Sequence, residues 1–175
     1  MILSDAERKS RAGSLLVLAI LLFGVGAAIV AISYQRTQTQ NCLEFYGPKV
    51  SRHITKAPVV ELWKLSLDHS AHHLLATQKC EITNAQGIVH LRRGFVEDAG
   101  FRWGVMGPPE RLPMEIWDYA FVFSDPNLDE QIAVVVNLDA QGGWMAVVGQ
   151  PGRVALGRLG KGLQDWIQDV NPLHE

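Results

Sequence analysis

The 175-residue sequence is poor in charge and almost without cysteine. Charged residues make up 19% of it and there are two cysteines, whereas roughly a quarter of a typical soluble domain is charged. The motifs GxSxG, HExxH, CxxC and GxGxxG are absent, so hydrolases, metalloproteases, dithiol oxidoreductases and dinucleotide-binding proteins lack their simplest signature. The net charge is −2 and no basic stripe is present, which leaves nucleic acid little to bind. We therefore expect neither an enzyme, nor a cofactor, nor a nucleic-acid partner.

The charge deficit has a local cause, an apolar run near the start of the chain. Residues 15–32 read LLVLAILLFGVGAAIVAI, without a charge or an amide. A helix of this length rises roughly 27 Å, close to the hydrocarbon thickness of a bilayer. We predict a transmembrane helix over residues 15–34, after a tail at 1–14. The alternatives are a buried core helix and a signal peptide cleaved near Ala27, although the apolar region of a signal peptide normally runs only about 7–15 residues.

The residues that flank the apolar run predict its orientation. Three basic residues precede it within the tail, whereas Arg36 is the first basic residue after it. Because cytoplasmic flanks carry the excess of Lys and Arg, we expect a cytoplasmic N-terminus and an extracytoplasmic C-terminal part. The three basic residues of the tail are Arg8, Lys9 and Arg11.

Two pairs of residues suggest further associations. Gly24 and Ala28 are small residues four positions apart, a spacing that lets two membrane spans pack closely, so a homodimer through the span is one hypothesis.

Cys42 and Cys80 both follow the span, in the part that we expect to meet an oxidising compartment. A disulfide between them is one interpretation, and two separate thiols are the other.

The remainder of the chain predicts an α+β domain. We interpret residues 35–57 as a polar stalk, interrupted by Gly47-Pro48, and residues 58–175 as the extracytoplasmic domain. Alternating or continuous apolar patterns predict an antiparallel sheet of about six strands. The expected strands are 59–67, 78–83, 88–93, 116–123, 131–138 and 144–149, with a hairpin between the second and third and a meander through the last three. An apolar stripe at intervals of three and four predicts a C-terminal amphipathic helix over 154–170, packed on one face of the sheet.

The segment DHSAHH, residues 68–73, is the best candidate metal site. In one helical turn, His69 would lie beside His72 or His73, at intervals of three and four. Since neighbouring positions point about 100° apart, such a turn offers two ligands, whereas zinc needs three or four. Further ligands would have to come from elsewhere in the chain, with His53, His90, Cys42 or the Glu97-Asp98 pair as candidates. The alternative is an exposed connection in which histidine is only a polar side chain.

The segment RRGFVEDAGFRWG, residues 92–104, combines charged and aromatic side chains. Such a mixture is common at protein interfaces, so we predict partner contacts there. Adjacent carboxylates at Glu97 and Asp98 also allow an acid–base hypothesis, although a solvated salt-bridge cluster is the usual meaning of the pattern. The predicted partner-binding residues are Arg92, Arg93, Arg102 and Trp103.

These observations favour a membrane-anchored accessory or scaffold subunit of an envelope complex, which binds other proteins and performs no catalysis. A copper- or zinc-handling domain built on the histidines is the alternative. An enzyme that uses Glu97, Asp98 and the arginines is a third possibility.

Overall fold

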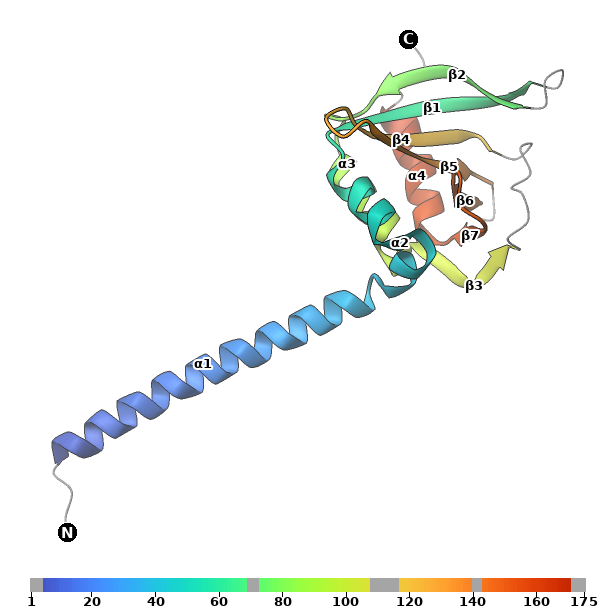
Figure 1. The fold of residues 1–175 in the computed structure, drawn as a ribbon. Coiled ribbons are helices and arrows are strands. Elements are labelled where there is room, and N and C mark those ends of the chain that lie inside the picture. Colours follow the sequence, from blue (N-terminus) through green and yellow to red (C-terminus); the bar gives the residue numbers. More distant parts are fainter. Residues whose placement is uncertain (1–4, 69–72, 108–116, 140–142, 171–175) are drawn as a thin grey trace. The chain divides into compact units, whose positions relative to one another are not determined.

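The computed structural model describes residues 5–68, 73–107, 117–139 and 143–170 of the chain. These form two compact units, Met1–Gln38 and Thr39–Glu175. Figure 1 labels the helices and strands of both units.

The first unit is a single helix, α1 (Asp5–Thr37). Its stretch Val17–Thr37 is long and apolar enough to span a membrane, and none of that stretch is buried against protein. Large apolar side chains such as Phe23 and Val30 are therefore exposed along it. This finding confirms the predicted apolar helix, although α1 begins before and ends after the predicted bounds 15–34.

The second unit contains a seven-stranded sheet in the part of the chain that is described, with the order β2-β1-β4-β5-β6-β7-β3. Every pair of neighbouring strands is antiparallel. The strands are β1 (Val59–Asp68), β2 (His73–Glu81), β3 (Phe101–Gly107), β4 (Tyr119–Asp125), β5 (Glu130–Asn137), β6 (Trp144–Val147) and β7 (Arg153–Leu156).

Three helices pack on one face of this sheet (Figure 1). They are α2 (Gln40–Lys56), α3 (Ile88–Val96) and α4 (Arg158–Val170), and a short 3-10 turn, η1 (Asp98–Gly100), follows α3. Tyr46 of α2, Phe95 of α3 and Leu163 of α4 are buried in one main core together with Phe121 and Phe123 of β4. Burial of a large apolar side chain typically stabilises a fold by about 1.5–3 kcal/mol, so this face holds the domain together.

A second, smaller apolar cluster covers the other face of the sheet. Its buried members are Trp117, Ala120, Val122, Val135 and Ala146, and Trp63, Leu65, Leu74, Ala133 and Trp144 pack against them. All of these residues come from strands or directly precede β4, and α2, α3 and α4 contribute none. We call this side of the sheet the second face.

The predicted α+β class, the antiparallel sheet and the C-terminal helix are confirmed, but the sheet has seven strands and not six. The meander is present as β4, β5 and β6. The predicted strand 88–93 is wrong, because these residues belong to α3. Consequently the predicted hairpin is also wrong, and β2 pairs with β1 instead.

Two boundaries also differ from the prediction. Residues 153–156 form β7, so the C-terminal helix begins at Arg158 and not at 154. A Cβ atom on the intervening Gly157 would lie 3.1 Å from the carbonyl oxygen of Gly100, which shows how closely the strand-to-helix connection approaches a neighbouring segment. The predicted stalk contains α2, whose Cys42 and Ile54 are fully buried, and the compact unit begins at Thr39.

Candidate binding sites

Most of the predicted histidine site lies outside the described residues. This holds for His69 and His72, and His73 is described only by its backbone, which pairs with Asp68 at the start of β2. Among the described residues, no group of three or more histidine, cysteine or acidic side chains is arranged to hold a metal ion. The metal hypothesis therefore stays a prediction.

The acidic residue Asp98 binds the N-terminus of α2. Its Oδ1 accepts a hydrogen bond from the backbone N–H of Cys42 at 2.8 Å, and its Oδ2 accepts from the backbone N–H and the side-chain amide of Asn41, both at 3.0 Å. The first N–H groups of a helix have no partner within the helix, and the side chain of Thr39, which precedes α2, forms no capping bond. Asp98 therefore supplies from a distance the acceptor that an N-cap residue normally provides.

The basic residue Arg92 binds the other end of the same helix. Its guanidinium donates to the carbonyl oxygens of Ile54 at 3.3 Å and of Ala57 at 2.7 Å. These are carbonyls of the last turn of α2 and the residue after it, which lack partners within the helix. Partial burial lowers the pKa of Arg92. The segment 92–98 therefore holds α2 at both ends.

Each of the remaining predicted partner-binding residues has its own contacts within the domain. Arg93 forms a hydrogen-bonded ion pair with Glu97. The Trp103 indole donates to the carbonyl oxygen of Asp98 at 2.9 Å and is half-buried. Arg102 is exposed in β3, where it pairs with Ala155 of β7. The carboxylates of Glu97 and Asp98 thus serve separate partners, Arg93 and the N-terminus of α2.

Both cysteines carry free thiols in the structure, the second of the two interpretations considered for them. Cys42 is buried in the main core and Cys80 is half-buried in β2. Burial, followed by the hydrogen bond to Asp98, raises the pKa of the Cys42 thiol. Because the thiolate is the reactive form, Cys42 is expected to be chemically inert.

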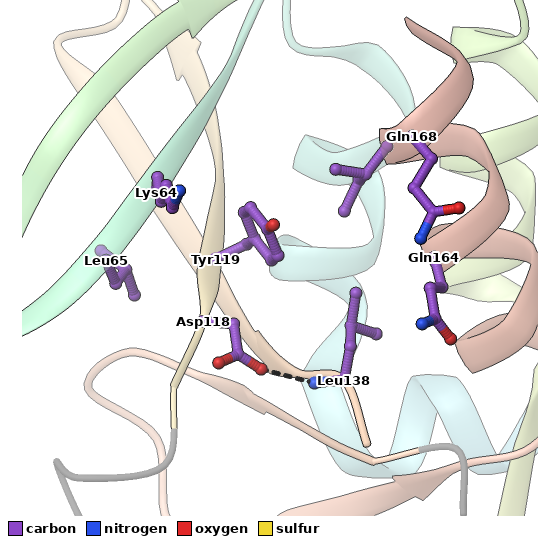
Figure 2. A pocket seen from close by; sticks show the side chains of 8 residues that line it. Lys64, Leu65, Asp118, Tyr119, Leu138, Gln164 and Gln168 are labelled. Atoms are coloured by element: carbon purple, nitrogen blue, oxygen red, sulfur yellow. Dashed lines mark hydrogen bonds between the residues drawn. The ribbon is translucent and has the colours of Figure 1, made fainter. Parts of the chain in front are cut away.

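A polar pocket of about 310 Å³ lies between α4, the middle of β1 and the start of β4 (Figure 2). Its lining residues include both apolar and polar side chains. The apolar ones are Leu65, Leu138 and Ile167, and the polar ones are Lys64, Asp118, Tyr119, Gln164 and Gln168. The volume is at the lower end of the range for small-ligand pockets.

The pocket is built on an irregularity in β1. The register with β2 shifts between Lys64 and Leu65, and such bulges re-aim side chains and are frequent beside functional sites. The backbone N–H of Leu65 then donates to the carbonyl oxygen of Asp118 at 2.8 Å. Leu65 lines the pocket and also packs against the second apolar cluster, so the pocket adjoins the second face.

The chemistry of the pocket suits binding of a polar group. The Asp118 Oδ2 accepts hydrogen bonds from the Leu138 backbone at 2.8 Å and from the Asn137 side chain at 3.2 Å, which fixes the carboxylate. Burial and the nearby Asp118 charge raise the pKa of Tyr119, so the phenol remains a hydrogen-bond donor at neutral pH. None of the described lining residues is a serine, threonine, cysteine or histidine, the types that form the common nucleophile–base pairs.

Two tryptophans on the second face each carry a cation over the ring. The Nζ of Lys79 lies 3.8 Å from the ring centroid of Trp63, and the guanidinium of Arg153 lies 4.3 Å from that of Trp144. Both indoles remain partly exposed, and the indole N–H of Trp63 is buried without a hydrogen-bond partner among the described residues. The second face therefore combines exposed aromatic area with positive charge.

Comparison with known proteins adds no relative. The chain matches no family model, and no curated protein or solved structure is significantly similar to it. The described residues form an N-terminal apolar helix followed by a seven-stranded antiparallel sheet with helices packed on one face. Neither the pocket nor the second face was predicted from the sequence, although Trp63 and Trp144 were placed in strands.

Proposed function

We propose that the chain is a single-pass membrane protein with a cytoplasmic N-terminus, and that its extracytoplasmic domain binds another envelope protein as an accessory or scaffold subunit. The apolar stretch Val17–Thr37 and the excess of basic residues before it support the anchor and its direction. Because the compact unit begins at Thr39, directly after α1, the binding domain is tethered close to the span in sequence.

We place the contact with the partner protein on the second face of the sheet. Tryptophan and arginine are the residue types most enriched at the energetic centres of protein interfaces, and Trp63 and Trp144 present partly exposed rings on one sheet face. Lys79 and Arg153 beside them favour a partner whose contact surface is apolar at its centre and acidic at its rim. The polar pocket beside Leu65 would receive a polar side chain of the same partner.

The test is co-purification of the full chain in mild detergent after cross-linking in its native membrane. We expect a defined partner that is lost with W63A/W144A and weakened by the charge reversal K79E/R153E, which leaves the sheet core intact. The matched control is L43A/V89A, because Leu43 and Val89 are exposed apolar residues of α2 and α3 on the other side of the sheet. A chain that repeatedly purifies alone would contradict the proposal, and so would a partner retained equally by all three variants.

A further inference from the structure

One side of α2 carries four nitrogen-bearing side chains at helical spacing. Lys49, Arg52, His53 and Lys56 follow one another at intervals of three, one and three, so they lie along the same side of the helix. They line a groove of about 570 Å³, which is within the usual size range of ligand pockets. The other lining residues are Pro48, Ala57, Asp125, Leu128 and Glu130, which places the opposite wall at the turn between β4 and β5.

His53 lines this groove, and one of its two ring nitrogens is unsatisfied. The residue is only 8% exposed, and its Nδ1 lies 3.7 Å from a carboxylate oxygen of Glu130. Its Nε2 is buried and has no hydrogen-bond partner among the described residues. A buried polar atom without a partner costs free energy, and a ligand that offers an oxygen to Nε2 would recover that cost.

The acidic residues of the groove are already engaged. Lys49 Nζ lies 2.7 Å from Glu130, and the carboxylate of Asp125 accepts a hydrogen bond from the backbone N–H of Asn127 at 3.0 Å. Within the described part of the chain, no carboxylate lies within ion-pair distance of Arg52 or Lys56. Their charges are therefore available to a ligand, and the side chains that bear them are exposed.

We propose that this groove binds a phosphate group carried by a small molecule or by a lipid headgroup. A phosphate offers several acceptor oxygens at once, and guanidinium and ammonium groups bind it through charge-assisted hydrogen bonds. Arg52 and Lys56 supply the charge, and His53 supplies the buried contact that distinguishes a shaped site from a merely basic surface. The site lies on the helix that follows the apolar span and is separate from the second face, so it does not depend on the proposed protein partner.

The test uses the full chain in an uncharged detergent. Calorimetric titration with inorganic phosphate and with glycerol phosphate, at constant ionic strength against chloride, measures the soluble ligand. Native mass spectrometry with phosphatidylglycerol, against phosphatidylcholine as the comparison lipid, measures the headgroup. We expect R52Q/K56Q to weaken binding about tenfold or more, as the loss of charge-assisted bonds implies. The control R158Q/K161Q removes the same charge from exposed positions of α4 outside the groove.

The variant H53F separates a shaped site from general attraction. It removes both ring nitrogens, the unpartnered Nε2 and the Nδ1 near Glu130, and keeps a ring, so the chain should remain folded while phosphate binding falls. Binding of the soluble ligands alone identifies a phosphorylated small molecule, and binding of phosphatidylglycerol alone identifies the headgroup. Equal weakening by R52Q/K56Q and R158Q/K161Q would overturn the proposal, as would the absence of binding to every probe at millimolar concentration. W63A/W144A should bind phosphate like the wild type, which keeps this test independent of the proposed function.

Discussion

Asp98 and Cys42 are 56 positions apart in the sequence, yet the carboxylate of Asp98 accepts the backbone N–H of Cys42 at 2.8 Å. Through this bond the turn after α3 caps the N-terminus of α2. Arg92, six residues before Asp98, binds the carbonyls at the other end of the same helix. The charged segment that suggested a partner site is thus used, at these two positions, to hold in place the helix that follows the apolar span.

Replacement of Asp98 should destabilise the domain. D98A leaves the N–H groups of Asn41 and Cys42 without their acceptor, and loss of a helix cap with a charged hydrogen bond costs about 1–3 kcal/mol. Urea unfolding of the full chain in detergent, followed by circular dichroism, measures the change. D98N keeps an acceptor oxygen and should lose less. If D98A were as stable as the wild type, α2 would not depend on this cap.

The stability of the domain should fall at alkaline pH. Burial raises the pKa of Tyr46 well above its ordinary value, and burial also raises that of Cys42. The unfolded chain releases these protons above about pH 8.5 for the thiol and about pH 10 for the phenol, whereas the folded chain retains them. Unfolding is therefore favoured as the pH rises through this range, and the stabilising contribution is complete below it.

Thermal unfolding between about pH 8 and about pH 11 measures this dependence, because the range brackets both unfolded-state values. Y46F removes the phenol, which donates to the Phe95 carbonyl at 2.8 Å, so the variant should be less stable by about 1 kcal/mol at neutral pH. Its stability should also decline less steeply at high pH. An alkaline slope identical to that of the wild type would show that Tyr46 does not contribute to it.

The glycine that precedes β6 should tolerate no side chain. Gly143 has φ of +83°, and a Cβ atom there would clash with the carbonyl oxygen of Asn137. G143A should therefore destabilise the domain by more than about 3 kcal/mol and displace the neighbouring Trp144. Gly149 has the same φ, but a Cβ atom there would have no neighbour within 4 Å, so G149A should cost only about 1–2 kcal/mol. Equal unfolding midpoints for the two variants would contradict the close approach at Gly143.

The fold was predictable where local pattern and burial agree. Alternation from Trp117 to Phe123 and the apolar run of 131–138 correspond to β4 and β5, which lie next to each other near the middle of the sheet. The segment 88–93 is rich in residues that favour strands, but Ile88, Leu91 and Phe95 face the core at helical spacing and form α3. The choice between strand and helix therefore depends on the apolar pattern of a segment longer than these six residues.

The missed helix α2 has a different cause. Gly47-Pro48 suggested a break, and the backbone at Gly47 does leave the helical region, with φ of +77°. The helix nevertheless resumes at Pro48, because proline is favoured in the first turn of a helix. Its ends are completed by Asp98 and Arg92, which no local pattern connects to it.

The candidate sites depend on contacts between distant residues and were therefore hidden in the sequence. The polar pocket combines Lys64 of β1 with Tyr119 of β4 and Gln164 of α4. The groove on α2 needs Glu130 of β5 as its opposite wall. A strand pattern correctly placed Trp63 and Trp144 in the sheet. Their position on one face, with Lys79 and Arg153 over the rings, depends on how the strands pair, which the pattern does not give.

The most direct test of the account is the topology of the full chain, because the proposed compartment and partner both rest on the anchor. The measurement combines alkaline carbonate extraction of membranes with an alkaline phosphatase fusion after Glu175, expressed in a bacterial host. The account predicts that the unprocessed chain stays in the carbonate-washed membrane and that the phosphatase, which needs an oxidising compartment, is active. Release of the full-length chain by carbonate, or an inactive phosphatase on a membrane-retained chain, would contradict it.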